Sequence, residues 1–344
     1  MSDGDDDPGC APTPGTDSSA TADGTAPTQI AIACQGGGSH TAFTAGVLRE
    51  ILSHWEESDE DFELVGISGT SGGAFNALAV WYGLVTGDES TAIEVVDGIW
   101  RDIAATDAFD QLLNSWLTTY ARLDNNGFAL PTMSPYYSPG SNVGKQRIAA
   151  VLERHIDFEE IPGLCAYEEP ELVVGTVNLE TGTFETFTNE AVTVDAVLAS
   201  AALPTIFEAV EIDGEPHWDG LFSQNPPVKD LLSVPGERTP EELWVIQINP
   251  QVRSGTPTST AEIATRRNEL AGNISLNQEL RFIERINEWI ENGHFDHPEY
   301  TTTTVRRIEL TGYGQSTKLD RDPDFIEELM ARGEEQAAAF LDDR

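Results

Sequence analysis

From residue 29 onward, short apolar runs alternate with segments whose apolar residues repeat at helical spacing. The runs typical of strands are residues 29–35, 62–68, 171–177 and 243–248. The segments typical of helices are residues 41–55, 72–84 and 92–104. The last two runs are nearly continuous in apolar residues, as strands covered on both faces are. This alternation predicts an α/β fold of three layers, α/β/α, around a mostly parallel central sheet.

Two further sequence features define the domain organisation. Residues 1–28 contain six Asp, four Pro, four Gly and no basic residue, which predicts a disordered acidic tail. The tail has no apolar stretch of a secretory signal, and none precedes Cys10 as a lipoprotein anchor requires, so we expect a cytoplasmic protein. No composition shift divides residues 29–344, which we expect to form one domain, with a two-residue hairpin turn at Asp213 and Gly214.

The charge balance excludes several functions. The chain carries 19 Lys and Arg against 59 Asp and Glu, a net charge of −40, and only three of its basic residues are Lys. Such a surface repels the phosphates of nucleic acids and of anionic lipid headgroups, so we expect no nucleic-acid partner. Because salt screens this self-repulsion, the composition predicts a halophilic protein adapted to molar salt. No apolar run is long enough to span a membrane.

Residues 69–73 (GTSGG) match the pattern G-x-S-x-G between a predicted strand and a predicted helix of small residues. This strand–turn–helix arrangement is that of a nucleophile elbow, in which a sharp turn exposes a serine. It predicts Ser71 as the nucleophile, with Gly69 and Gly73 leaving room for the turn. The amide of Gly72, at the start of the helix, would point at a developing oxyanion.

A second glycine-rich turn, Gly36 to Gly38, joins the first predicted strand to the first predicted helix. It lacks the Lys-Ser/Thr pair of a nucleotide-binding P-loop, and Thr41 stands where a dinucleotide motif has its third glycine. Nucleotide cofactors are therefore not expected. Beside a nucleophilic serine, the amides of Gly36, Gly37 and Gly38 are candidates for an oxyanion hole.

A serine nucleophile needs a base, and the sequence leaves its identity open. None of the six histidines stands in an obvious triad context, although His294 or His297 would complete a Ser–Asp–His triad in the chain order of α/β-hydrolases. Asp219 precedes a glycine after a predicted hairpin strand. From the residues alone, Asp219 is a base or an ordinary turn aspartate.

Four segments together resemble the patatin-like phospholipase family. They are residues 35–48 (QGGGSHTAFTAGVL), 66–73 (GISGTSGG), 196–204 (AVLASAALP) and 218–220 (WDG), in family order within residues 29–344. The resemblance implies a patatin-like three-layer fold and a catalytic dyad, with Ser71 as nucleophile and Asp219 as its base. It implies that Gly37 and Gly38 donate to the oxyanion, and that neither a metal nor another cofactor is required.

Two positions depart from the family pattern. The glycine-rich loop usually continues with a Lys or Arg and a Gly, and here His40 and Thr41 stand in their places. His40 would either take the basic role near the substrate or cap the helix. Leu221 adds a side chain where the family prefers Gly or Ala after the aspartate–glycine pair. Both changes bear on the shape of the substrate site.

Two remaining features allow a functional and a plain interpretation. Apolar residues including Trp116 form a helical stripe within residues 109–123, which is either a lid that contacts substrate or a helix packed on the core. His294 and His297 flank an aspartate in a turn, but no partner cluster accompanies them, and we expect no metal site.

The sequence thus predicts a serine acyl-ester hydrolase with a Ser–Asp dyad, acting on a lipid or other acyl ester and touching a lipid or granule surface transiently. One alternative is an intracellular depolymerase of polyhydroxyalkanoate granules with the same dyad, because the ether lipids of a salt-adapted archaeon would resist this chemistry. A further alternative is a non-catalytic protein that binds granules or membranes and retains the fold.

Overall fold

The structure is a computed structural model that describes residues 27–57, 62–106, 110–111, 114–115, 134–137, 139–166, 169–204, 206–232, 238–252, 255–258, 260–295, 301–314 and 317–344. The predicted acidic tail lies outside these residues, apart from its last two positions. The predicted stripe within residues 109–123, Trp116 included, lies mostly outside them as well.

The described residues form a mixed sheet of eight strands. The strands are β1 (Thr28–Cys34), β2 (Phe62–Gly69), β3 (Glu171–Asn178), β4 (Phe184–Thr188), β5 (Val210–Ile212), β6 (Glu215–Asp219), β7 (Glu242–Gln247) and β8 (Thr304–Glu309). Their order is β5-β6-β3-β2-β1-β7-β8, and β4 also pairs with β3. The five strands from β3 to β8 in this order are parallel, whereas β4, β5 and β6 pair in antiparallel fashion.

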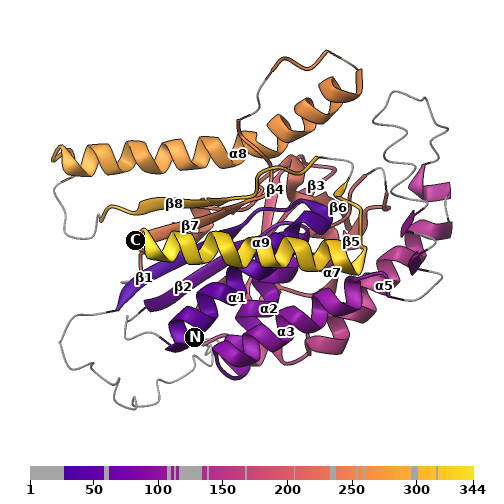
Figure 1. Ribbon diagram of the computed structural model, residues 1–344, viewed down its shortest axis with the longest axis horizontal. Helices are drawn as coiled ribbons and strands as arrows, with labels where there is room; N and C mark the ends of the chain where they lie inside the picture. The colour runs from indigo at the N-terminus through magenta and orange to yellow at the C-terminus, as the bar shows by residue number, and fades with distance from the viewer. Residues whose placement is uncertain are drawn as a thin grey trace, which may run out of the picture.

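Helices cover both faces of the sheet, which confirms the predicted three-layer α/β fold (Figure 1). The larger helices are α1 (Ala42–Glu57), α2 (Gly72–Thr86), α3 (Glu89–Ile103), α5 (Pro139–His155), α8 (Thr260–Glu291) and α9 (Pro323–Asp342). Two short ones are α6 (Ile161–Leu164) and α7 (Val194–Ser200). Helices α1, α2, α3 and α9 share the main core with Ile30 and Ile32 of β1. Helix α8 packs against the opposite face, where Leu276 and Leu280 meet Ala31 and Ala33.

The alternation of the side chains of β1 explains this layering. Successive residues of a strand point to opposite faces, so an unbroken apolar run such as residues 30–34 feeds both cores. The predicted strands at residues 29–35, 62–68 and 243–248 match β1, β2 and β7 to within one or two residues at either end.

The register of the parallel strands brings three loops to one edge of the sheet. Cys34, the last residue of β1, pairs with Gly69 of β2 and with Ile246 of β7. The segments that follow these three residues therefore emerge side by side at the carboxyl edge, where open α/β sheets place their ligands.

The predicted hairpin turn is confirmed between β5 and β6. Asp213 and Gly214 have φ angles of 53° and 85°, as a type I′ turn requires, and both strands belong to the central sheet. Strand β6 pairs with β3 so that Asp219 lies opposite Thr176. The hairpin thereby brings Asp219 to the edge of the sheet that also carries the loop after β2.

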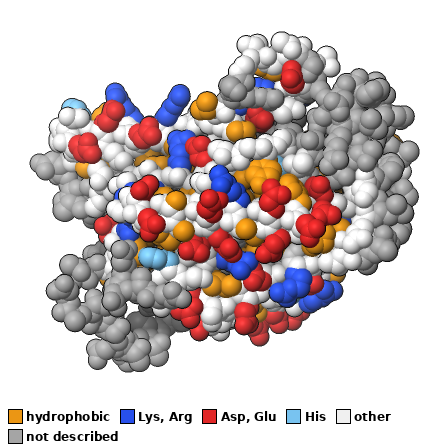
Figure 2. Space-filling view, in the orientation of Figure 1, with side chains coloured by type: hydrophobic (Ala, Val, Ile, Leu, Met, Phe, Trp, Pro, Cys, Tyr) orange, Lys and Arg blue, Asp and Glu red, His pale blue; other side chains and the backbone are white. Residues whose placement is uncertain are grey.

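The acidic composition is visible at the surface. Asp and Glu side chains are spread over the face that α9 crosses (Figure 2). No helix among the described residues has both the length and the apolar character needed to cross a bilayer.

Candidate active site

Ser71 occupies a strained turn between β2 and α2. Its φ of 57° lies in the left-handed region that non-glycine residues seldom adopt, and its side chain is almost completely buried. The turn is closed by hydrogen bonds from the amides of Gly73 to Thr70 O and of Ala74 to Ser71 O, both 2.9 Å long. This strained turn between a strand and a helix lies where the sequence predicts a nucleophile elbow.

The glycine after the elbow has a steric reason. A Cβ atom on Gly73 would lie 2.2 Å from the carbonyl oxygen of Cys34 on the neighbouring strand, and only glycine avoids this clash. The amide of Thr70 also donates to Cys34 O, at 3.4 Å. The turn that carries Ser71 therefore packs directly against the last residue of β1.

A serine outside the predicted site fixes the backbone of the nucleophile. The amide of Ser71 donates to Ser200 Oγ at 2.9 Å, and the Ser200 hydroxyl donates to Gly175 O at 2.7 Å. Ser200 ends α7 and is fully buried. Because its acceptor is part of β3, it ties the strained turn to the sheet.

Asp219 meets Ser71 at this edge. Its carboxylate is buried, accepts the amide of Leu221 at 2.8 Å and is hydrogen-bonded to the Ser71 side chain. Burial raises the pKa of Asp219 to about 7, against the opposing effects of the Leu221 amide, the Ser71 hydroxyl and the charge of Lys318. A carboxylate with a pKa near neutrality is a far better general base than one with the ordinary value near 4.

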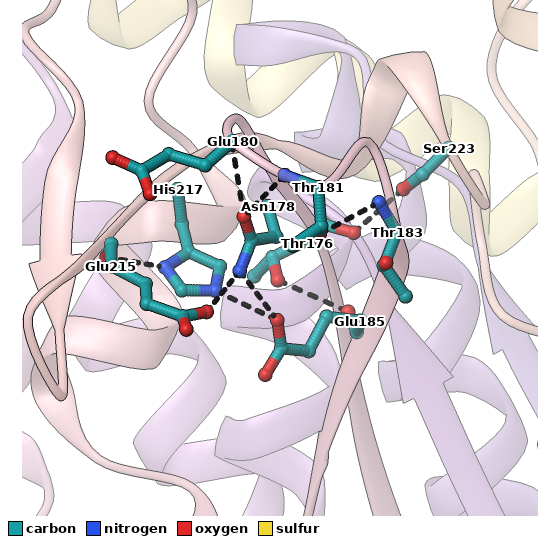
Figure 3. Close-up of polar contacts among 9 residues, drawn as sticks. All are labelled: Thr176, Asn178, Glu180, Thr181, Thr183, Glu185, Glu215, His217 and Ser223. Carbon is teal, nitrogen blue, oxygen red and sulfur yellow. Dashed lines mark hydrogen bonds and ion pairs between the residues drawn. The ribbon is translucent and has the colours of Figure 1, made fainter.

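A polar network joins strands β3, β4 and β6 around Asn178 and His217 (Figure 3). His217, two residues before Asp219 on β6, is buried, and its Nε2 lies 2.9 Å from Glu185 Oε2 on β4. The hydroxyl of Ser223 donates to Thr176 O at 2.8 Å, directly beside the register position of Asp219. These bonds join β6 to β4 and the turn after β6 to β3.

The glycine-rich loop passes over Ser71. The amide of Gly36 donates to Asn225 Oδ1 at 2.7 Å, so it is already engaged. The predicted role of Gly36 as an oxyanion donor would require its amide to give up this hydrogen bond. The amides of Gly37 and Gly38 make no hydrogen bond within the part of the chain that the structure describes, and they remain candidate donors together with Gly72.

Buried amide side chains join the loop to the rest of the site. Gln35 is their hub: its Oε1 accepts the amides of Ile248 and Asn249 at 2.9 and 2.7 Å. Its Nε2 donates to Asn273 Oδ1 at 2.9 Å and to Asn225 O at 3.2 Å. We call Gln35, Asn225, Asn249 and Asn273 the amide clasp. Sequence reasoning did not find it, although Gln35 and Asn249 each follow an apolar strand directly.

The cation of the site is Lys318, which sequence reasoning also missed. It lies between β8 and α9, and its ammonium group donates to Asn249 Oδ1 of the amide clasp. Its backbone carbonyl accepts the amide of Ser39 at 2.7 Å, which anchors the glycine loop. Gly38 has a φ of 62°, and a Cβ there would lie 2.3 Å from Lys318 O. Residue 318 and the glycine loop are therefore in direct backbone contact.

His40 does not take the basic role that its place in the loop suggested. Burial, followed by the charge of Lys318, lowers the pKa of His40 to about 3, so the ring is neutral at neutral pH. Its Nε2 lies 2.7 Å from Thr317 Oγ1, and its ring packs edge-on against Tyr313 and Phe325. His40 is a buried contact for the segment that carries Lys318.

The triad alternative does not fit the geometry for His294. His294 lies in the turn after α8, whereas the part of α8 at the site is Gly272, next to Leu221. At 1.5 Å per helical residue the two positions are about 30 Å apart, far beyond hydrogen-bond reach. His297 lies outside the described residues, as does Trp116. No cluster of three or more potential metal ligands occurs in the described part of the chain.

The site therefore combines a serine on a strained turn, a buried carboxylate hydrogen-bonded to it and loop amides that make no hydrogen bond among the described residues, an arrangement chemically capable of nucleophilic catalysis without histidine. Residues 32–232 match the family described as patatin-like phospholipase, and the chain belongs to that family. The matched region includes both Ser71 and Asp219 but ends well before Lys318.

Among solved structures, the chain is similar to VipD from Legionella pneumophila, at 12% identity and a TM-score of 0.40, over 91% of this chain and 69% of that one. It is similar to the type III effector protein ExoU at 14% identity and a TM-score of 0.37, over 92% of this chain and 53% of that one. ExoU in its complex with SpcU, from the type III secretion system of Pseudomonas aeruginosa, gives 13% identity and the same TM-score, over 92% of this chain and 51% of that one. No curated protein matches the chain.

Proposed function

We propose that this protein is a lipid acyl hydrolase that cleaves carboxylic esters with a Ser71–Asp219 dyad. The observation that carries the proposal is the buried Asp219 carboxylate hydrogen-bonded to the hydroxyl of a serine on a strained elbow. Membership of the patatin-like phospholipase family supports lipid esters as the substrate class.

In the first half of the reaction, Ser71 Oγ attacks the ester carbonyl carbon while Asp219 takes the hydroxyl proton. The carbonyl oxygen becomes an oxyanion opposite the amides of Gly37, Gly38 and Gly72. Collapse of this intermediate breaks the ester bond, and the leaving alcohol takes the proton from Asp219. The product is an acyl group on Ser71.

In the second half, Asp219 removes a proton from water, which attacks the acyl-serine carbonyl. The second oxyanion uses the same amides, and its collapse returns the proton to Ser71 Oγ and releases the carboxylic acid. The desolvated Asp219, with its pKa of about 7, is matched to giving and taking this proton near neutral pH.

An exposed apolar face of α8 supports a substrate presented in an aggregate. The amino-terminal half of α8, whose Gly272 touches Leu221, exposes Ile263, Leu270 and Ile274 at 51, 42 and 56%. Their spacing of seven and four residues places them on one face of the helix, with the exposed Arg267 between them. This face lies on the side of α8 turned away from Leu221, and it fits the surface of an ester lipid.

The composition bears on the working medium. The net charge of −40 and the acidic surface favour molar salt, in which screening removes the repulsion between carboxylates. We therefore place the assays below in molar KCl.

The test is hydrolysis of p-nitrophenyl esters of increasing chain length, and of vesicles of ester phospholipid, by the wild type and by Ser71→Ala. We expect the substitution to lower kcat/KM at least about 10³-fold, since the nucleophile is lost. Ser68→Ala is the matched control: the Ser68 hydroxyl is buried and has no partner among the described residues.

Equal hydrolysis by wild type and Ser71→Ala would contradict the proposal. A folded wild type that releases acid from polyhydroxyalkanoate granules and from neither other substrate would replace lipid with polyester. A folded wild type that is inactive on all three but sediments with vesicles or granules would indicate a binding protein.

A further inference from the structure

The segment between β8 and α9 places a cation in the site from the far end of the chain. The Lys318 ammonium donates to Asn249 Oδ1, and Asn249 Nδ2 donates in turn to Gly36 O at 3.4 Å. The Lys318 carbonyl accepts the amide of Ser39. The side chain of Lys318 is thus linked through Asn249 to Gly36 at the start of the glycine loop, and its backbone carbonyl is bonded to Ser39 at the end of that loop.

Lys318 lies among charged groups of both signs. Its electrostatic partners are the buried carboxylates Asp219 on β6 and Glu269 on α8. Glu269 is itself paired with Arg266, at 3.1 Å, while His40 on the loop side is neutral. Lys318 is therefore the positive charge that acts on Asp219 from within the site.

The scarcity of lysine makes this placement informative. The chain has three lysines against 59 acidic residues, and an ammonium group carries a strong cost when it loses its hydration. Lys145 lies on α5 and Lys229 on the surface after β6, both outside the site. One of the three lysines thus lies half-buried beside the glycine loop, with its ammonium on Asn249, where a structural role alone could be filled by an uncharged donor.

We propose that Lys318 is a positioning residue of the hydrolase, which holds Asp219 in its ionised, proton-accepting form and fixes the glycine loop through Asn249. The inference rests on the proposed function, since it assigns Lys318 to the base of that reaction. The inference also accounts for the neutral His40, because Lys318 supplies the positive charge that the loop lacks. His40 contacts Thr317, the residue immediately before Lys318.

The protonation states follow from the charges. Burial lowers the pKa of Lys318 to about 8, while the charges of Glu269 and Asp219 oppose that change. For Asp219, burial raises the pKa and the charge of Lys318 lowers it; the resulting pKa is about 7. Activity should rise with pH as Asp219 ionises, and fall again as Lys318 loses its proton.

A first experiment measures the coupling without any substrate. Lysine labelled with ¹³C at Cε gives three resonances in the full-length chain, which Lys145→Arg, Lys229→Arg and Lys318→Arg assign one by one. We expect the Lys318 resonance to titrate near pH 8, and Asp219→Asn to lower its midpoint by about one pH unit, since a neighbouring negative charge is removed. An unchanged midpoint in Asp219→Asn would overturn the inference.

A second experiment measures the consequence for activity. Lys318→Met should move the acidic limb of the kcat/KM profile to higher pH by about one unit and remove the alkaline limb. Lys318→Arg keeps the charge, so it should keep the acidic limb in place and remove only the alkaline one. Lys229→Met is the control and should leave the profile unchanged.

An acidic limb that stays in place in Lys318→Met contradicts the proposed role. If Lys318→Met does not fold, the Arg variant decides, because an alkaline limb that persists in Lys318→Arg would overturn the inference. Absence of ester hydrolysis in the wild type would overturn the proposed function instead, and the resonance measurement would still decide the coupling.

Discussion

The two sides of the candidate active site are built in different ways. The nucleophile side consists of short, local turns: residues 69–73 follow β2, and residues 36–38 follow β1. The cation side, which holds Lys318, is assembled from the amide clasp and from segments more than 200 residues apart. The first is imposed by backbone geometry at a strand end. The second exists only once the whole sheet has formed.

This difference teaches which interactions leave a trace in the sequence. A turn that needs glycine on both sides of a strained serine leaves a recognisable pattern, because no other residue fits. A buried glutamine with five hydrogen bonds leaves none, since its partners are mostly backbone groups of distant segments.

The largest effect expected is on the carboxylate that faces the nucleophile. Asp219→Asn should lower kcat/KM at least about 10³-fold while the protein stays folded, because an amide accepts no proton from Ser71. Asp213→Asn, in the turn of the same hairpin, is the control and should retain activity, since asparagine tolerates a φ of 53°. Steady-state kinetics on a soluble ester decides, and comparable rates for both variants would assign the base elsewhere.

The second largest effect is expected on the stability of the protein when the amide clasp is disrupted. Gln35→Leu leaves the buried amides of Ile248 and Asn249 without acceptors and should lower the free energy of unfolding by about 3 kcal/mol. Gln29→Leu, which removes a single 3.4 Å hydrogen bond to Glu63, should change it by less than about 0.5 kcal/mol. Urea unfolding in molar KCl measures both. Equal values would show that the clasp contributes no more than a surface contact.

The smallest effect is expected at the link between the two sides of the comparison. Ser200→Ala removes the acceptor of the Ser71 amide and should lower kcat about 10-fold, because the strained turn is free to relax. Ser90→Ala, at the exposed start of α3, is the control. A Ser200→Ala enzyme with full kcat would mean that the elbow holds its conformation without help from α7.

The fold was predictable as far as local patterns extend. Strands β1, β2, β3 and β7 and helices α1, α2 and α3 follow from apolar periodicity. Helix α8 was not predicted, although it has 32 residues, because Arg, Asn and Glu interrupt its apolar stripe. Its buried face includes Asn273 and Glu269, which serve the site and not the core.

For the candidate site, the sequence predicts the two candidate reacting side chains but not the residues around them. Ser71 and Asp219 stand in motifs, and the structure brings them together. The backbone amide of Gly36 was expected to donate to the oxyanion, but it donates to the Asn225 side chain. Only the folded structure reveals that contact. His40, where the family pattern has a basic residue, was expected either to take the basic role or to cap the helix; its ring is neutral, and Lys318, which the sequence did not single out, contacts the glycine loop.

The position of Lys318 late in the chain also concerns the order in which the protein is made. A ribosome completes the elbow and Asp219 about a hundred residues before Lys318, which is followed by α9, the helix that packs on α1. During that interval a nascent chain would carry its nucleophile and its base without the charge that keeps the base ionised. On the proposed role of Lys318, such a chain would hydrolyse esters more slowly near neutral pH than one that has reached Lys318, because the pKa of its Asp219 would be higher.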